Sequence, residues 1–464
     1  MRMAGYRGRA VLIVGGGVSG LPAARVLLGL GARVTIADRR YAGGPPDGRA
    51  RELADAGAAL TGDLAEPPVG TELVITRPGA RPDEPVLVAA AVAGIEVMCE
   101  VELAWRLRPA GQTWLAITGT NGKTTAVGML ESILHAAGSR AVAAGNIGYT
   151  TIEAVTSDPA YDVLAVELSS FQLHWSSTVS PAASAILNLA PDHMEWYDGD
   201  LAAYAADKAR IFRPDAVDVY NADDQGVTAL AARFPTTVGC TLGAPAAGQL
   251  GIVAGSLVDK AFIADPEGVV LASTGDVRPP GRHNIANALA AAALARAHGV
   301  PPVAIAAGLR DYQPGAHRNA YVATVSGVDY VDDSKATNPH AAAASLAAYP
   351  RIVWIAGGQL KNTDVDPLVA RFADRLAGAV VLGIDRQQIA DAIVRHAPDL
   401  RVVDVANRDD GAMSIAVRKA AGLATRGDTV LLAPAAASLD MFASYAARGD
   451  AFIAAVSAIR SVAR

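Results

Sequence analysis

The sequence has few cysteines and no excess of basic residues. Only Cys99 and Cys240 occur among 464 residues, too few for a disulfide framework or a cysteine metal cluster, which is typical of proteins in a reducing compartment. The formal net charge of -6 excludes the basic field that drives non-specific binding to nucleic acid. We therefore expect a cytoplasmic protein with no nucleic-acid partner.

Long apolar runs are also absent. No uninterrupted apolar stretch is long enough to cross a membrane as a helix. Residues 1–9 lead directly into a short apolar run and glycines, without the apolar core and cleavage site of a signal peptide. We interpret the alanine-rich stretch Ala286 to Ala297 as a packed helix. The sequence thus predicts no membrane insertion.

What the sequence does contain is an alternation of apolar runs, glycine loops and helical patterns, which predicts parallel α/β layers. The length favours about three domains of roughly 100 to 200 residues. Pro and Gly interrupt the pattern near 108–111 and 313–315, which predicts domains at 1–108, 109–313 and 314–464. The predicted strands are Val11–Val14, Val34–Ala37, Leu73–Thr76, Leu115–Thr118, Val163–Val166, Ser184–Leu189, Ile352–Ala356, Val380–Leu382, Arg401–Val405 and Val430–Ala433.

A first glycine loop follows the first predicted strand. Its sequence is Gly15-Gly16-Gly17-Val18-Ser19-Gly20, and Asp38 closes the next strand at about the expected distance. Glycines let the backbone approach a diphosphate, and the following helix N-terminus offers unpaired N–H groups. Arg39 and Arg40 beside Asp38 would suit a phosphate or a polar headgroup, although solvated arginines at a strand end are just as ordinary. The loop alone does not separate NAD from another diphosphate such as a UDP-sugar, and a tight turn without ligand is the structural alternative.

A second glycine loop gives the sharpest local signal. It reads Gly119-Thr120-Asn121-Gly122-Lys123-Thr124-Thr125, between a predicted strand and a predicted helix. In a loop of this kind backbone N–H groups hold phosphates, Lys123 reaches the β and γ oxygens, and the Thr124 hydroxyl binds Mg²⁺. Ile117 occupies the place of the first glycine in the full Walker pattern, so a chance match to the shorter form is the alternative.

Two further residues stand where a doubly wound sheet gathers its ligands. Glu167 ends an apolar strand, and His193 follows the strand Ser184–Leu189. Alone, each would more often be structural or solvated. After a phosphate-binding loop on the same sheet, Glu167 is a natural Mg²⁺ ligand and a neutral His193 imidazole could hold a metal.

These motifs, with others in fixed order, resemble the Mur ligase family over nearly the whole chain. The matching runs are Gly119 to Thr125, Gly145 to Gly148, Glu167 to Leu173, Asp192 to Met194, Asn221 to Asp224, Gly281 to Asn284 with Asn287, His317-Arg318, Asp333 to Asn338, Gly357 to Lys361, and Pro434 to Ser438 with Tyr445. Two runs depart from the pattern. Arg77-Pro78-Gly79 stands where the family commonly has Ser-Pro-Gly, and Asn319-Ala320 stands where an aromatic residue and an acid are usual.

The resemblance implies an α/β protein of three domains: an N-terminal Rossmann-like domain for a UDP-muramoyl substrate, a central P-loop ATPase with a mixed sheet, and a C-terminal Rossmann-like domain for an amino acid. The run Glu167 to Leu173 is most similar to the branch that adds D-glutamate to UDP-N-acetylmuramoyl-L-alanine. The implied activity is ATP-dependent amide ligation through an acyl phosphate, in peptidoglycan precursor synthesis. A monomer is expected.

The resemblance also implies roles for the matching positions. The implied ATP contacts are Gly119, Thr120, Asn121, Gly122, Lys123, Thr124, Thr125, Asn284, Asn287, Arg318 and Asp333. The implied UDP-substrate contacts are Gly15, Val18, Ser19, Gly20, Asp38, Arg39, Arg77, Gly79, Asn146, Ser169 and Gln172. The implied amino-acid contacts are Lys335, Thr337, Lys361, Ser438 and Tyr445. Taken singly, these residues have ordinary alternatives as helix-face amides, caps or solvated lysines.

The implied catalytic residues are Lys123, Glu167, His193 and Lys208, and two Mg²⁺ ions are implied. Thr124 and Glu167 would serve the first ion. His193 and Lys208 would serve the second, with Lys208 carrying a carbamate made from CO₂. From the sequence alone Lys208 is an ordinary solvated helix lysine, but an ammonium beside two Mg²⁺ ions would repel them, whereas a carbamate supplies a hard oxygen ligand.

Rival functions explain only parts of the sequence. An NAD-dependent oxidoreductase accounts for the first glycine loop but not the second. A regulatory P-loop NTPase accounts for the second loop but not the first. Within the family, a ligase for another amino acid or a folylpolyglutamate synthetase is the nearest alternative, although the folate enzymes lack an N-terminal unit of this kind before the phosphate-binding loop.

Overall fold

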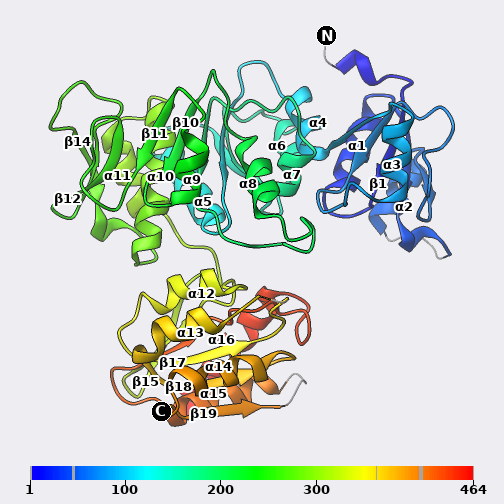
Figure 1. The fold of residues 1–464 in the computed structure, drawn as a ribbon. Helices are drawn as coiled ribbons and strands as arrows, with labels where there is room; N and C mark the ends of the chain where they lie inside the picture. Colours follow the sequence, from blue (N-terminus) through cyan, green and yellow to red (C-terminus); the bar gives the residue numbers. More distant parts are fainter. Residues whose placement is uncertain (1–2, 44–47, 362, 407–410, 463–464) are drawn as a thin grey trace. The chain divides into compact units, whose positions relative to one another are not determined.

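The computed structural model describes residues 3–43, 48–361, 363–406 and 411–462 (Figure 1). Its residues form two compact units. The first comprises residues 1–276 and 286–312, and the second comprises residues 277–285 and 313–464. The first unit contains two sheets and the second contains one. Among the described residues, no helix is both long enough and apolar enough to cross a bilayer.

The first sheet is fully parallel, with strand order β3-β2-β1-β4-β5. Its strands are β1 Ala10–Val14, β2 Arg33–Ala37, β3 Ala59–Thr61, β4 Leu73–Thr76 and β5 Glu96–Cys99, and its helices are α1 Gly20–Gly29, α2 Gly48–Asp55, α3 Pro85–Val92 and α4 Glu100–Leu107. Val14 pairs with Ala37 on one side and Thr76 on the other. The glycine loop and the residues after β2 and β4 therefore meet at one edge, where such sheets bind ligands.

The second sheet has nine strands in the order β14-β13-β12-β11-β10-β9-β6-β8-β7. The strands from β7 to β12 are parallel, and β13 and β14 add an antiparallel edge. Its strands are β6 Thr113–Thr118, β7 Ala141–Gly145, β8 Val163–Glu167, β9 Ala183–Ile186, β10 Val217–Asn221, β11 Thr237–Cys240, β12 Gln249–Val253, β13 Ser256–Asp259 and β14 Val269–Ser273. Its helices are α5 Lys123–Ala136, α6 Thr151–Val155, α7 Ser170–His174, α8 Leu201–Ala209, α9 Gln225–Ala231, α10 Arg282–Ala297 and α11 Pro302–Asp311.

The third sheet, in the second unit, has the order β15-β16-β20-β17-β18-β19 and is parallel except for β15. Its strands are β15 Ala320–Val325, β16 Val328–Asp332, β17 Ile352–Gly357, β18 Leu376–Leu382, β19 Val402–Val405 and β20 Thr429–Leu432. Its helices are α12 Pro339–Leu346, α13 Asp366–Phe372, α14 Arg386–His396, α15 Ala412–Leu423 and α16 Tyr445–Val462. Separate apolar cores cover its two faces, as expected for a buried parallel sheet.

The predicted strands are present, with shifted ends. The strand predicted at Ser184–Leu189 ends at Ile186 as β9, because the next residues turn to bind the phosphate-binding loop: the backbone carbonyl of Asn188 accepts from Thr120 N–H at 3.0 Å. β18 begins at Leu376, four residues before the predicted Val380. The sequence patterns did not predict β3, β5, β7 or β10 to β16.

Glu100 joins the two sheets of the first unit. It begins α4 after the first sheet, is only 2% exposed, and accepts hydrogen bonds from the Thr151 hydroxyl at 2.8 Å and the Ile152 N–H at the start of α6. Burial raises the pKa of Glu100 to about 7, because a low-dielectric site disfavours the carboxylate.

This raised pKa predicts a pH dependence of stability. The folded chain holds the Glu100 proton more tightly than the unfolded chain, so the full stabilisation is present below the ordinary glutamate pKa and is lost as pH rises toward 7. Glu100→Gln keeps an acceptor for both donors and does not titrate. Urea unfolding from pH 4.5 to 7.5 should show the parent losing about 1 to 3 kcal/mol more than the variant. Identical pH profiles would contradict this account.

Candidate active site

The first glycine loop is held by the acid that follows β2. Asp38 accepts a hydrogen bond from the Gly16 N–H at 2.8 Å and pairs with Arg40 at 3.0 Å. The hydrogen bonds from Arg40 hold the pKa of the Asp38 carboxyl well below its usual range. Gly20 has no room for a side chain, since a Cβ there would lie 1.9 Å from the Gly15 carbonyl oxygen. In dinucleotide-binding folds, the third glycine of the loop allows this same close packing of helix against strand.

The residues predicted to contact a UDP-substrate fall into two groups. Val18 and Arg39 are exposed beside the glycine loop, and Arg77 lies against it: a Cβ at Gly15 would be 3.2 Å from the Arg77 Cδ. By contrast, Ser169 and Gln172 form a capping box at the start of α7. Those two side chains have a clear structural role, and their contact with substrate stays a prediction.

The second glycine loop is held on both sides by the protein's own side chains. Gly122 is in the left-handed conformation at the N-cap of α5, where φ is 84°. A Cβ on Gly122 would lie 2.4 Å from the Asn287 Oδ1, so α10 packs directly against the loop. Asn188 binds the loop on its other side, accepting from the Asn121 N–H at 2.8 Å and donating to the Asn121 carbonyl at 3.0 Å. The loop is therefore preorganised for phosphate.

Three predicted polar residues meet beside this loop. The Thr124 hydroxyl donates to Glu167 Oε2 at 2.6 Å, and the Asn146 amide donates to Glu167 Oε1 at 3.0 Å. The register explains the meeting, because Glu167 at the end of β8 pairs with Ile117 of β6 and Gly145 of β7. Glu167 is 2% exposed. Its carboxylate and the Thr124 hydroxyl are hard oxygen donors of the type that Mg²⁺ prefers.

Two lysine side chains share one carbonyl oxygen in this site. Lys123 Nζ donates to the Gly119 carbonyl at 2.9 Å, and Lys208 Nζ donates to the same oxygen at 3.0 Å. Lys208 is 2% exposed, so the interpretation of it as a solvated helix lysine is wrong. The sequence could not show that the end of α8 packs against the phosphate-binding loop. Burial and the nearby Lys123 charge hold the pKa of Lys208 well below its ordinary value.

His193 lies on the loop after β9. Its backbone is in the left-handed region at φ 54°, and its ring contacts Phe171 at a centroid distance of 4.9 Å. Its Nε2 is 3.6 Å from the Asp192 carboxylate. Within the described parts of the chain, no three His, Cys, Asp or Glu side chains form a metal cage. Mg²⁺ at triphosphate sites is ordinarily held by one or two carboxylates with phosphate oxygens and water, and the Thr124 and Glu167 pair fits that mode.

In the second unit, several residues predicted to bind ATP or the amino acid cluster around β16. Lys335 Nζ lies 4.0 Å from the centroid of the Tyr445 ring, and burial raises the pKa of Asp333 to about 6. Asn319, one of the residues that differ from the Mur ligase pattern, has φ 51°, a left-handed conformation that asparagine tolerates. Its N–H donates to Asp333 at 3.1 Å. Asparagine at this position is thus compatible with a left-handed turn whose backbone holds Asp333.

The other predicted residues of this unit lie on four segments. Thr337 follows Lys335 in the turn after β16, and its N–H donates to the Lys335 carbonyl at 2.8 Å. Lys361 is exposed beyond β17 at φ 52°. Ser438 is 3% exposed, and its carbonyl accepts from two following N–H groups, so it begins a turn rather than capping α16. Asn284 is 3% exposed and donates to the Pro279 carbonyl at 3.0 Å.

Sequence reasoning missed two residues that build these sites, Asn188 and Arg448. Arg448 is 2% exposed and donates to the Ser334 carbonyl at 2.9 Å and the Ala436 carbonyl at 3.1 Å. It thereby joins the turn after β16 to the loop after β20. Its position three residues after Tyr445 in a helical pattern was the only available signal.

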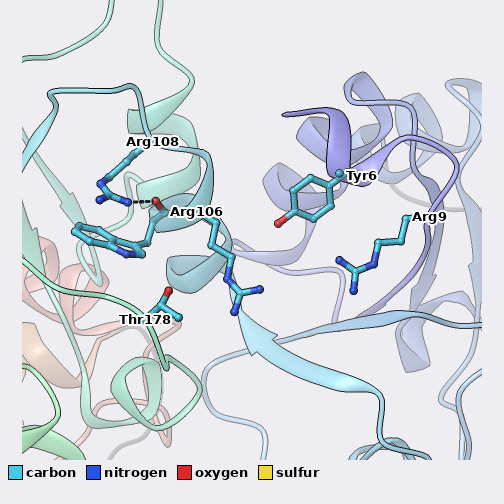
Figure 2. A pocket seen from close by; sticks show the side chains of 7 residues that line it. Tyr6, Arg9, Arg106, Arg108 and Thr178 are labelled. Atoms are coloured by element: carbon cyan, nitrogen blue, oxygen red, sulfur yellow. Dashed lines mark hydrogen bonds between the residues drawn. The ribbon is translucent and has the colours of Figure 1, made fainter. Parts of the chain in front are cut away.

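A separate cavity of about 500 Å³ lies elsewhere in the first unit (Figure 2). Its charged lining consists of Arg9, Arg106 and Arg108. Arg106 is paired with Glu102 at 2.8 Å, and Arg108 stacks on Trp105 at 3.3 Å from the ring centroid. Arg9 precedes β1, whereas the glycine loop follows it, so this cavity lies at the opposite strand ends. None of the predicted site residues lines it.

Comparison with known proteins identifies the family. Residues 117–295 match the Mur ligase middle domain, and residues 317–436 match the Mur ligase glutamate ligase domain. A protein of Thermobifida fusca named UDP-N-acetylmuramoylalanine--D-glutamate ligase is 57% identical over 98% of this chain and 99% of its own length. The chain belongs to the Mur ligase family. A Streptomyces avermitilis protein of the same name is 54% identical over the same shares.

Solved structures of Mur ligases have the same fold. The alanine ligase MurC of Thermotoga maritima aligns with a TM-score of 0.61 at 16% identity, covering 97% of this chain and 99% of that one. The expected three-part α/β fold is thus confirmed. A match to the alanine dehydrogenase C-terminal domain is confined to residues 2–45, around the first glycine loop. The oxidoreductase alternative therefore accounts for that loop alone.

The two hydrogen bonds between Asn188 and Asn121 hold the phosphate-binding loop like a clamp. We expect a variant without this clamp to bind nucleotide more weakly. Asn188→Ala removes both hydrogen bonds to Asn121 and should weaken ADP binding about tenfold, the effect of losing about 1.4 kcal/mol. Asn188→Asp keeps the acceptor and loses the donor, so it should fall between the parent and the alanine variant. Calorimetric titration of ADP with Mg²⁺ measures this order, and parent-like affinity in Asn188→Ala would show that the loop does not need its clamp.

Proposed function

We propose that this chain is an ATP-dependent ligase that adds D-glutamate to UDP-N-acetylmuramoyl-L-alanine in peptidoglycan precursor synthesis. The observation that supports this proposal most strongly is the 2.6 Å hydrogen bond from the Thr124 hydroxyl to the Glu167 carboxylate, beside the phosphate-binding loop. The names of relatives that are 57% and 54% identical over nearly the whole chain support the substrates. We further propose that it acts in the cytoplasm as a monomer.

The three parts would divide the work. We propose that residues 1–108 bind the UDP-substrate at the first glycine loop, residues 109–313 bind ATP, and residues 314–464 bind D-glutamate. The proposed ATP contacts are Gly119 to Thr125, Asn284, Asn287, Arg318 and Asp333. The proposed amino-acid contacts are Lys335, Thr337, Lys361, Ser438 and Tyr445. The proposed UDP-substrate contacts are Gly15, Val18, Ser19, Gly20, Asp38, Arg39, Arg77, Gly79, Asn146, Ser169 and Gln172.

Two transfers at the substrate carboxyl group make the amide. A carboxylate oxygen of the alanyl group attacks the γ-phosphorus of ATP, ADP leaves, and an acyl phosphate forms. The amine of D-glutamate then attacks the carbonyl carbon, and phosphate leaves with that oxygen. Lys123 and the N–H groups of its loop offset the negative charge of the phosphoryl group. Thr124 and Glu167 would hold one Mg²⁺, which supplies Lewis-acid stabilisation of the phosphate oxygens.

Lys208 is suited to become a carbamate. Its low pKa favours the neutral amine, which is the form that adds to CO₂ with loss of a proton. The resulting carbamate would place an anionic oxygen ligand beside Lys123. We propose that it would hold a second Mg²⁺ together with His193.

The carbamate predicts chemical rescue. Lys208→Ala should lose activity by about a hundredfold or more, as when one charge-stabilising group is removed. Added acetate should restore part of it by supplying a carboxylate in the vacated space. Lys208→Arg should stay inactive with or without acetate, because guanidinium cannot become a carbamate. Full activity in Lys208→Arg, measured as phosphate release, would show that the lysine has no such role.

The amino-acid assignment predicts both a substrate and a variant phenotype. Phosphate release with UDP-N-acetylmuramoyl-L-alanine should be fastest with D-glutamate among D- and L-amino acids. Lys361→Ala removes a charge proposed to hold a carboxylate and should chiefly raise the KM for D-glutamate. Lys419→Ala, on α15, serves as an exposed-lysine control and should match the parent. A better rate with L-lysine or L-alanine would refute the assignment.

A further inference from the structure

Two loops of the first unit touch across the boundary between its sheets. The first, residues 77–84, connects β4 to α3 and contains Arg77 and Gly79; we call it the edge loop. The second, residues 187–200, connects β9 to α8 and contains His193; we call it the histidine loop. Both belong to one compact unit.

Arg81 of the edge loop holds the histidine loop at two points. Its Nη1 donates to the Glu195 carbonyl at 2.6 Å, and its Nη2 donates to both carboxylate oxygens of Asp198, at 3.0 and 3.2 Å. A second carboxylate, from Asp83 of its own loop, accepts from Arg81 Nε at 3.1 Å. The planar guanidinium is suited to such a fixed fork, which an ammonium could not reproduce.

Two tryptophans add hydrogen bonds in the opposite direction. Trp196 Nε1 of the histidine loop donates to the Gly79 carbonyl at 3.3 Å, and Trp175 Nε1 donates to the Ala80 carbonyl at 3.2 Å. Successive carbonyls of the edge loop are thus fixed by the second sheet's elements.

The Trp196 ring leads to both proposed residues of the second metal site. It packs against Phe171 at a centroid distance of 5.0 Å, and Phe171 packs against His193 at 4.9 Å. It also packs against Tyr197 at 4.6 Å, whose hydroxyl donates to Asp207 at 3.2 Å, the residue next to Lys208. The path from Gly79 therefore combines aromatic ring contacts with two hydrogen bonds, Trp196 to Gly79 and Tyr197 to Asp207.

We propose that Arg81 and Trp196 are positioning residues that couple the binding of the UDP-substrate to the binding of divalent metal at the His193 and Lys208 site. The coupling rests on the proposed function, because that function places the substrate at the edge loop. Substrate that fixes the edge loop orients the histidine loop through Arg81 and Trp196. By linkage, bound metal strengthens substrate binding by the same factor.

The test measures Mn²⁺ binding rather than turnover. The full chain with ADP is titrated with Mn²⁺, and the free ion is followed by its paramagnetic resonance signal, with and without UDP-N-acetylmuramoyl-L-alanine. The parent should bind Mn²⁺ about two- to fivefold more tightly when substrate is present, the range expected from a few exposed polar contacts. Arg81→Gln and Trp196→Phe should each lose at least half of this enhancement, and the double variant should lose all of it.

A matched control separates contacts across the boundary from contacts within the edge loop. Asp83→Asn removes a carboxylate partner of Arg81 without touching the histidine loop, and it should keep the parent's enhancement. Arg81→Lys should retain only a small part of the enhancement of Mn²⁺ binding by substrate. A merely structural role would lower stability or both affinities while leaving the enhancement ratio unchanged, so the ratio is the deciding quantity.

The outcomes are distinct. No enhancement in the parent, an undiminished ratio in both single variants, or an equal loss in Asp83→Asn would each overturn the coupling. Parallel assays of phosphate release with D-glutamate test the proposed function separately. Enhancement without turnover would refute the ligase assignment and leave the coupling standing, whereas turnover with an unchanged ratio in the variants would do the reverse.

Discussion

The Gly119 carbonyl oxygen receives hydrogen bonds from two lysine side chains, and much of the first unit is arranged around that contact. Lys123 reaches it from the start of α5 and Lys208 from the end of α8. Two ammonium groups cannot stay charged at such close quarters in a buried site without a large cost. Burial and the Lys123 charge lower the pKa of Lys208, and this eases the conflict.

Parallel strands explain how residues distant in sequence reach this contact. β6, β8 and β9 lie side by side, so the phosphate-binding loop, Glu167 and Asn188 all emerge at the same edge. The first sheet repeats the principle with its glycine loop, Asp38 and Arg77. Since Arg81 and Trp196 connect the two edges, the fold supplies a direct physical route between a site suited to a diphosphate and a site suited to a triphosphate with metal.

Local patterns predicted part of this accurately. Ten of the twenty strands that the structure describes, both glycine loops, and the pairing of Thr124 with Glu167 follow from periodicity and from where parallel strands end. The burial of Lys208 did not, because its position on α8 becomes internal only through contact with the phosphate-binding loop. The role of Asn188 was not predicted for a related reason. The apolar run extended the predicted strand to Leu189, whereas β9 ends at Ile186 because Asn188 accepts hydrogen bonds from the backbone N–H groups of Asn121 and Thr120 instead. The roles of the individual site residues remain predictions.

The central claim is that the substrate carboxylate, and not water, receives the phosphoryl group of ATP. Isotope transfer tests it most directly. UDP-N-acetylmuramoyl-L-alanine with both alanyl carboxylate oxygens labelled as ¹⁸O is incubated with the chain, ATP, Mg²⁺ and D-glutamate, and the released phosphate is analysed by mass spectrometry. An acyl phosphate predicts one labelled oxygen in each phosphate formed. Phosphate without label, released while the amide product forms, would contradict the account.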